Sequence, residues 1–249
     1  MFPDTLAPCC GRRPHNIDNS EGRRRGRTVL LMDFWNICLQ LAEGMLTSLA
    51  IFALTLIFSL PLGLLVAFAR KSKHAWLRVP VKVYISVMRG TPLMLQLLIV
   101  YFGPYLIFGA KLSADYRFPA TIIAFSVNYA AYFAEIFRSG IESVPAGQYE
   151  AAQVLGLSRR QCFFRVIFPQ VIKRVLPPVT NEVITLVKDT SLAYAIAVTE
   201  MFTLAKQIAA AESSLLPYLA AGIFYYIFNF LVAFAMERAE RAFDYYQTK

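Results

Sequence analysis

Charged residues are scarce in this sequence of 249 residues. Only 16% of them are Asp, Glu, Lys or Arg, whereas 57% are apolar. Soluble domains carry about 25% charged and about 45–50% apolar residues, so this composition excludes an ordinary soluble protein. It predicts instead a chain that lies in a lipid bilayer.

Cysteine and histidine are also rare. Cys9 and Cys10 lie near the start, Cys38 and Cys162 are isolated, and two histidines lie far apart in polar segments. Their spacing provides neither a disulfide framework nor a CxxC metal pair. A membrane enzyme would need a converging nucleophile, base or metal ligand set, which these residues do not offer. We therefore expect no catalytic residue and no metal site in this chain.

Five long stretches of the sequence have few or no charges. A membrane crossing needs about 20 apolar residues, because the hydrocarbon layer is roughly 30 Å thick. We expect crossings at residues 44–69, 91–110, 118–137, 179–202 and 213–236. The fourth stretch is the weakest, since it contains Lys188, Asp189 and Glu200, and charges inside a span usually have a function. The predicted fold class is an all-α membrane protein with five transmembrane helices.

Basic residues concentrate in the connections after the first and third stretches. Lys and Arg favour cytoplasmic loops, so both connections are expected in the cytoplasm. The connections 111–117 and 203–212 carry few charges and are expected outside. Five crossings then place the N-terminus outside and the C-terminus in the cytoplasm. The net charge of +9 is explained by the basic loops, which favour phosphate-rich lipid headgroups over nucleic acid as neighbours.

Residues 1–31 conflict with this orientation, because they contain six arginines next to the first span. Either translation begins at Met32, or 1–31 form a disordered tail that is translocated against the usual charge rule. No apolar core follows the arginines at the distance that a signal peptide requires. We expect residues 32–249 to form the membrane domain.

A charged segment, EAAQVLGLSRRQCFFRVIFPQ at residues 150–170, interrupts the apolar chain. Pro145 suits the first turn of a helix and Gly156 suits a left-handed helix end, which predicts one helix of about eleven residues. Ser158 and Gln161 have the spacing of a capping box, so a second helix is expected from Arg159 until Pro169 interrupts it. The pair forms either a rigid cytoplasmic elbow for a partner or an interfacial helix pair that only packs.

Several motifs resemble known transporter sequences. Glu150-Ala151-Ala152, Gly156 and Phe168-Pro169 have the spacing of the EAA loop of bacterial ATP-binding cassette (ABC) importer permeases, with Phe in place of the usual Leu before the proline. The sequence also resembles the polar amino acid uptake (histidine and glutamine) permease family, from about residue 40 to the end. The segments that carry this resemblance are RGTPLMLQLLIVYFG (89–103), NYAAYFAEIFRSGI (128–141), VPAGQYEAAQVLGLS (144–158) and LVKDTSLAYAIAVTE (186–200).

The resemblance implies a permease subunit with the type I importer (MetI-like) fold in the bacterial inner membrane. It implies a second permease half, identical or different, two ATPase subunits and an extracytoplasmic amino-acid-binding protein. The chain has no GxxxxGK[ST] phosphate loop, so ATP and Mg²⁺ are expected on the ATPase and not here. Within the loop 138–176, the ATPase-coupling residues implied are Glu150, Ala151, Ala152 and Gly156.

Polar residues inside the apolar stretches are candidates for a substrate path. Lys188 and Asp189 offer one charge for each group of a zwitterionic amino acid, yet the same two residues can neutralise each other or cap a broken helix. Aromatic residues on the third stretch are either pore-lining or packing residues. The candidates are Asn128, Tyr129, Tyr132, Lys188, Asp189, Thr190, Ser191 and Glu200.

Two other functional classes remain as alternatives. A small oligomeric channel does not explain the elbow, and a non-ABC secondary transporter needs more spans or an inverted repeat. We therefore expect the permease of an ATP-driven importer for polar amino acids.

Overall fold

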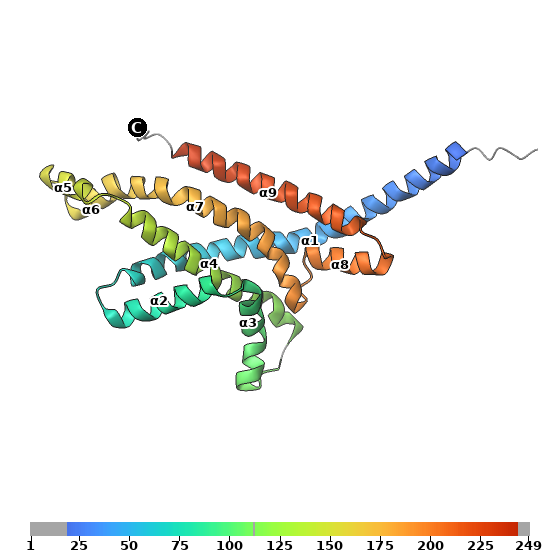
Figure 1. The fold of residues 1–249 in the computed structure, drawn as a ribbon, viewed down its shortest axis with the longest axis horizontal. Helices are drawn as coiled ribbons and strands as arrows, with labels where there is room; N and C mark the ends of the chain where they lie inside the picture. The colour runs from blue at the N-terminus through green and yellow to red at the C-terminus, as the bar shows by residue number, and fades with distance from the viewer. Residues whose placement is uncertain (1–18, 112, 244–249) are drawn as a thin grey trace, which may run out of the picture.

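The computed structural model describes residues 19–111 and 113–243, with side chains described from residue 34. Helices account for nearly all of this region (Figure 1). The helices are α1 (Asn19–Arg70), α2 (Ala75–Gly90), α3 (Leu93–Phe108), η1 (Ala114–Tyr116), α4 (Arg117–Glu142), α5 (Ala146–Val154), α6 (Arg159–Cys162), η2 (Phe163–Ile167), α7 (Phe168–Asp189), η3 (Thr190–Ile196), α8 (Met201–Glu212) and α9 (Leu216–Ala242).

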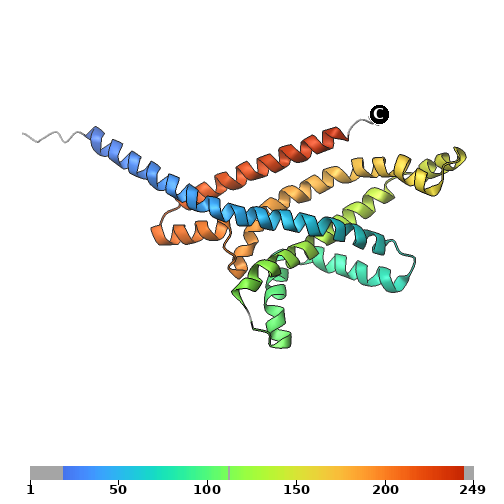
Figure 2. The same ribbon diagram turned by 180° about the vertical axis from the view of Figure 1, so that it is seen from behind.

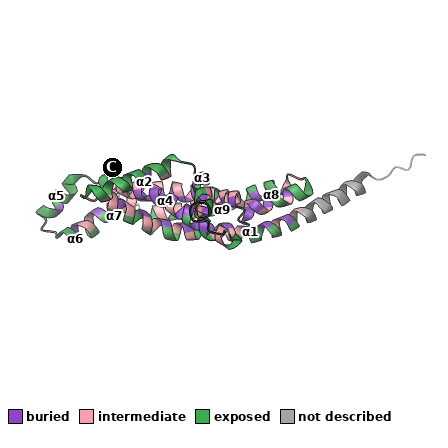
Figure 3. Ribbon diagram, turned by 90° about the horizontal axis from the view of Figure 1, so that it is seen from below, coloured by how far each residue is buried: buried purple, intermediate pink, exposed green. Residues whose placement is uncertain are grey.

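The long helices α1, α4, α7 and α9 run along the long axis of the molecule, whereas α3 lies across it (Figures 1 and 2). The short helices α5 and α6 form one end, near the end of α9, and α8 lies toward the other end. Buried residues concentrate in the middle of the bundle, while α5 and α6 are mostly exposed (Figure 3). The chain is therefore a helical bundle with a protruding helix pair at one end.

Residues 1–18, part of the segment expected to be a tail, lie outside the described residues. The helix α1 begins at Asn19, so its backbone is helical before Met32. The choice of Met32 as the start stays a prediction.

The expected count of five spans is only partly confirmed. Within the described residues, three helical segments are long and apolar enough to cross a membrane: Phe34–Arg70, Ala114–Glu142 and Leu216–Ala242. The pair α2 and α3 counts as a fourth if it is one broken span, with a bend of 112°. The expected span 179–202 is not one helix, because α7 ends at Asp189, a 3₁₀ segment follows, and Ala197 adopts a left-handed conformation with φ 55° before α8 begins.

Small residues let α1 approach its neighbours closely. A Cβ atom on Gly63 would lie 2.8 Å from Phe133 Cβ and 3.1 Å from the carbonyl oxygen of Ala130, both on α4. A Cβ atom on Gly44 would lie 2.7 Å from the Cα of Met201, on α8. Close backbone approach at small residues is the usual basis of helix packing in membranes, where lipid removes the hydrophobic drive between helices.

The corner between α2 and α3 follows from Pro92. In a continuous helix the carbonyl of Met88 would accept from the amide of residue 92, but proline has no N–H. Instead, the Gln96 side-chain amide donates to this carbonyl at 2.9 Å and Asn128 of α4 donates to it at 3.1 Å. Asn128 also donates to Gln96 at 2.8 Å. The backbone bond lost at the corner is thus replaced by two side chains, one of which ties the corner to α4.

We predict that Gly63→Leu destabilises the bundle, because the added side chain overlaps the backbone and Phe133 of α4. The expected loss is about 1–3 kcal/mol, typical of overpacking, seen as a lower midpoint of thermal unfolding in detergent. Gly222→Leu on α9 is the matched control, since a Cβ there meets no atom within 4 Å. Equal midpoints for the two variants would contradict this account of α1 and α4.

Candidate functional site

The protruding end of the molecule is the predicted elbow. The first helix, α5, follows Pro145, and Gly156 ends the segment with φ 70°, as its sequence position predicts. The capping box is confirmed, because the amide of Ser158 donates to Gln161 Oε1 at 2.9 Å and the amide of Gln161 donates to Ser158 Oγ at 3.4 Å. Two short helices at a left-handed glycine corner therefore form the elbow.

The second helix of the elbow differs from the prediction. It has only four α-helical residues, and it continues through a π-helical turn, η2, directly into α7. Pro169 does not interrupt it, since this residue is the second residue of α7 and the helix continues through it from the π turn. In the π turn the amide of Phe168 donates to the carbonyl of Phe163. The elbow is thus continuous with the long helix α7.

The tip of the elbow presents apolar side chains to its surroundings. Val154 is 88% exposed and Leu155 is 76% exposed. Glu150 and Ala151 are also exposed, whereas Ala152 is buried against the bundle. Sequence reasoning identified Glu150 and the alanines but not the two aliphatic residues. Exposed aliphatic side chains beside a carboxylate are a suitable surface for another protein.

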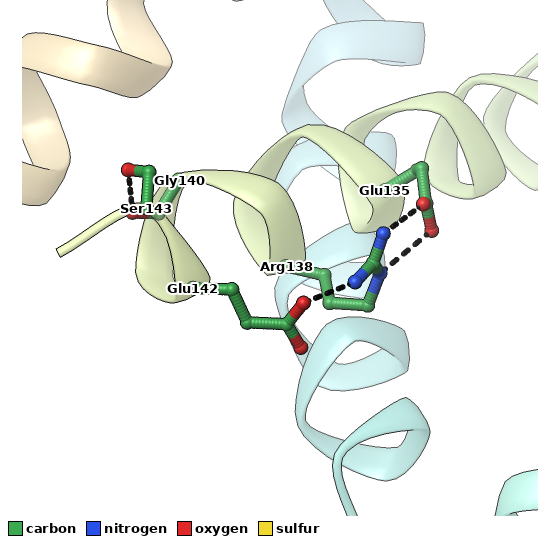
Figure 4. Close-up of polar contacts among 5 residues, drawn as sticks. All are labelled: Glu135, Arg138, Gly140, Glu142 and Ser143. Carbon is green, nitrogen blue, oxygen red and sulfur yellow. Dashed lines mark hydrogen bonds and ion pairs between the residues drawn. The ribbon is translucent and has the colours of Figure 1, made fainter. Parts of the chain in front are cut away.

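A polar cluster stabilises the last turns of α4, which lead into the elbow. Arg138 forms ion pairs with Glu135 and Glu142 on the same helix, and Ser143 Oγ donates to the carbonyl of Gly140 at 2.7 Å (Figure 4). The pair Glu135–Arg138 has the i, i+3 spacing at which side chains on one helix face meet. These contacts fix the last turns of α4 just before the elbow begins.

The same end of α4 is held against α7. Arg174 of α7 donates to the carbonyl of Ser143. A Cβ atom on Gly140 would overlap the side chain of Val175, so Val175 of α7 packs directly on the backbone of α4 at Gly140. The elbow is therefore attached to α4 at one side and to α7 at the other.

Polar residues of α4 and α7 meet further along the same two helices. Tyr129 donates a 2.7 Å hydrogen bond to Asp189 Oδ2. The guanidinium of Arg89 lies over the ring of Tyr132, 5.4 Å from its centroid. A cavity of about 430 Å³ lies beside Arg89 and Tyr132, with a lining that also includes Glu135, Ser139, Arg174 and Glu182 but not Tyr129 or Asp189.

Two residues of this region were missed by sequence reasoning. Glu182, half-buried on α7, lies within electrostatic range of Arg89 and Asp189. The sequence did offer a signal for Glu182. This carboxylate lies in the apolar first half of the expected fourth span, where a charge usually has a function. The sequence identified Arg89 only as a basic residue of a loop. The structure shows that Arg89 lines the cavity, next to the α2–α3 corner at Pro92.

The other predicted path residues have local structural partners. Thr190 donates to the carbonyl of Val187 at 2.8 Å, and Ser191 donates to the carbonyl of Lys188 at 2.8 Å. Lys188 is exposed, and within the described residues it forms no ion pair with Asp189. Asn128 holds the corner of α2 and α3. Thr190 and Ser191 thus bond to carbonyls of the last turn of α7, whereas Asp189 makes no side-chain cap at this break and the capping interpretation of Lys188 and Asp189 is not supported.

Glu200 lies in the interior and not at an outer surface, with an exposure of 0%. It caps α8 by accepting from the amides of Phe202 at 2.8 Å and Thr203 at 2.7 Å. Its carboxylate also accepts from the hydroxyls of Thr203, Ser48 and Tyr225 at 3.0, 3.3 and 3.2 Å. A carboxylate with five donors connects α1, α8 and α9 and has no free position for a solute or a binding protein.

Comparison with known proteins identifies the family to which this chain belongs. Residues 59–245 match the family described as the binding-protein-dependent transport system inner membrane component. The chain belongs to this family. The L-cystine transport system permease protein TcyB of Bacillus subtilis is 40% identical over 89% of this chain and 92% of its own length.

Other relatives agree with the assignment. The octopine transport system permease protein OccM of Rhizobium radiobacter is 40% identical over 71% of this chain and 76% of its own length. A crystal structure of an amino acid ABC transporter with histidines aligns with a TM-score of 0.76 and 30% identity, covering 86% of this chain and 97% of that one. The methionine transporter MetNI shares the fold, with a TM-score of 0.65, 21% identity, and coverage of 82% and 96%. The chain is thus the permease component of an amino-acid ABC importer with a MetI-like fold.

We predict that Glu200→Ala lowers stability strongly. The substitution removes a helix cap and leaves buried donors without an acceptor, at about 1–3 kcal/mol for each such group. Thermal unfolding of the purified protein measures this loss. Glu212→Ala, at the exposed end of the same helix, is the control and should change the midpoint little. A midpoint for Glu200→Ala equal to that of the control would show that the carboxylate is not a structural cap.

Proposed function

We propose that this chain forms one half of a dimeric permease that imports a polar amino acid, driven by ATP hydrolysis on separate subunits. One observation carries the proposal: the exposed elbow is attached to the ends of α4 and α7, and the same two helices carry the charged cavity. A movement of the elbow therefore reaches the polar residues through two continuous helices.

The proposed topology has five crossings, made by α1, the bent pair α2 and α3, α4, α7 and α9. The helix α7 is less apolar than the other proposed spans because it carries Lys173, Arg174, Glu182, Lys188 and Asp189. The basic residues near the elbow support a cytoplasmic position for that end. This orientation places the start of α1 outside and the end of α9 in the cytoplasm of a bacterial cell, with the chain in the inner membrane.

The proposed partner at the elbow is an ATPase subunit, which also holds ATP and Mg²⁺. Glu150 offers a carboxylate for a basic group, Ala151 allows close approach, and Val154 with Leu155 supply apolar contact. An extracytoplasmic binding protein is expected at the opposite end, and a second permease half, identical or not, completes the path. Rigid-body movement of the elbow would then alternate access to the cavity from the two sides.

The proposed substrate path runs along the α4 and α7 face, past Tyr132, Tyr129 and Asp189. Arg89 offers a cation for a carboxylate, whereas Glu182 and Asp189 offer anions for an ammonium group. A zwitterionic amino acid carries both groups. Relatives named for cystine, glutamine and octopine transport support a polar amino acid as the substrate.

We predict that Gly156→Pro uncouples ATP hydrolysis from uptake. Proline fixes φ near −65°, whereas this position has φ 70°, so the corner of the elbow must change. Uptake and ATPase activity are measured together in vesicles that contain the complete importer. Glu150→Lys, which reverses the exposed charge at the ATPase contact, is expected to act in the same way.

The control for these variants is Gly147→Ala within α5, where an added Cβ meets no atom within 4 Å. It should leave both activities unchanged. Membrane insertion, followed by the amount of folded protein, should be normal for all three variants. Normal uptake by both Gly156→Pro and Glu150→Lys would overturn the assignment of the elbow.

We predict that Asp189→Asn reduces uptake by roughly tenfold or more, because a contact to a charged group is lost while the side chain keeps its size and Tyr129 keeps an acceptor. Uptake kinetics at matched expression test this. Thr185→Ala, an exposed position on the same helix, should be neutral. Unchanged kinetics for Asp189→Asn would make Asp189 a structural residue.

A further inference from the structure

A second cavity, of about 500 Å³, lies between α1, α4 and the start of α7 and has no polar lining. We call it the phenylalanine groove. Its lining includes Leu64 and Phe68 of α1, Ile141 of α4, and Phe163, Phe164 and Phe168 near the π turn. The three phenylalanines at the π turn are in mutual contact, with ring centroids 5.2–6.2 Å apart.

Two backbone features shape this groove. Pro61 lies in the α1 wall, where it removes a helix hydrogen bond and favours a bend. On the opposite wall, the π turn inserts an extra residue into the helix and so brings Phe163, Phe164 and Phe168 to one side. The groove therefore results from the proline in α1 and the π turn, and not from the absence of one side chain.

The groove opens to the surroundings of the bundle. Phe164 is 63% exposed and Phe68 is 51% exposed. Phe68 lies near the end of the candidate span Phe34–Arg70, and Phe164 lies just before the start of α7. Both residues are therefore at the elbow end of the bundle. Large aromatic side chains exposed at this level need an apolar occupant, because contact with water would be unfavourable.

Basic residues flank the α1 and α7 walls of the groove, whereas the acidic residues next to its α4 wall, Glu135 and Glu142, are paired with Arg138. The segments 44–114 and 151–181, which supply most of its walls, contain no Asp or Glu. Lys71 follows Phe68 by three residues and Arg165 follows Phe164 directly; both are exposed. Within the described residues, neither forms an ion pair. The entrance region is thus basic without a protein counter-charge.

We propose that the phenylalanine groove binds an anionic phospholipid of the cytoplasmic leaflet, with an acyl chain in the groove and the phosphate near Lys71 and Arg165. Apolar lining matches the chain, and the acid-free basic flanks match the headgroup. The groove and the charged cavity share no lining residue, so this site is separate from the proposed substrate path.

Quenching of tryptophan fluorescence by brominated lipid tests the proposal. Phe164→Trp is introduced into the full chain, assembled with its partner subunits in bilayers, and the signal of the unsubstituted assembly is subtracted. Brominated phosphatidylglycerol should quench the introduced tryptophan more strongly than brominated phosphatidylcholine, with about fivefold tighter binding for each basic side chain involved. If Phe164→Trp does not fold, Leu64→Trp on the opposite wall takes its place.

Phe58→Trp is the matched control, an exposed phenylalanine of α1 that does not line the groove. Both lipids should quench it equally. Adding Lys71→Gln and Arg165→Gln should abolish the lipid preference of the Phe164→Trp variant and leave the control unchanged. Equal quenching of the Phe164→Trp variant by the two lipids would overturn the anionic lipid site. Absence of quenching by either lipid would overturn it too, in favour of a second protein chain that covers the groove.

Discussion

Backbone groups that lose their helical partner must be satisfied inside this bundle, because hydrocarbon offers no water to replace the bond. Two breaks interrupt the core of the structure, at the α2–α3 corner and between α7 and α8. At the first, Gln96 and Asn128 supply the carbonyl of Met88 with donors. At the second, Glu200 accepts from the free amides that begin α8. Each closing side chain also contacts a different helix, so the same bonds that repair the backbone hold the bundle together.

These repairs explain why polar residues in the apolar stretches have different tasks. Asn128 and Glu200 are fully used by backbone repair and helix contacts. Tyr129 and Asp189 bond to each other across α4 and α7, whereas Glu182 and Tyr132 line the cavity. Positions one turn apart on α4, such as Asn128 and Tyr132, thus serve a structural contact and the cavity respectively.

Much of the elbow was predictable from sequence, because caps and left-handed glycines act locally. Gly156, Ser158 and Gln161 each have the predicted role, whereas Pro145 is the N-cap residue just before the first turn and not within it. The π turn was not predictable, since it depends on how α7 packs, and so the expected stop at Pro169 was wrong. The expected fourth span was also wrong as one helix, because residues 179–202 have a suitable length but four charges, and the helix break at Asp189 depends on tertiary contacts. Residue types alone did not separate Glu200 from Asp189, since burial distinguishes the two carboxylates.

The contact of Gly140 with Val175 has a consequence for where a solute can pass. At this level α4 and α7 lie in direct contact, with the carbonyl of Ser143 bound by Arg174 on the same side. The Val175 side chain therefore closes this point of the seam, and the cavity lined by Gly140, Ser143 and Arg174 lies beside it. A solute that follows this cavity passes alongside the contact of Gly140 with Val175 and not through it.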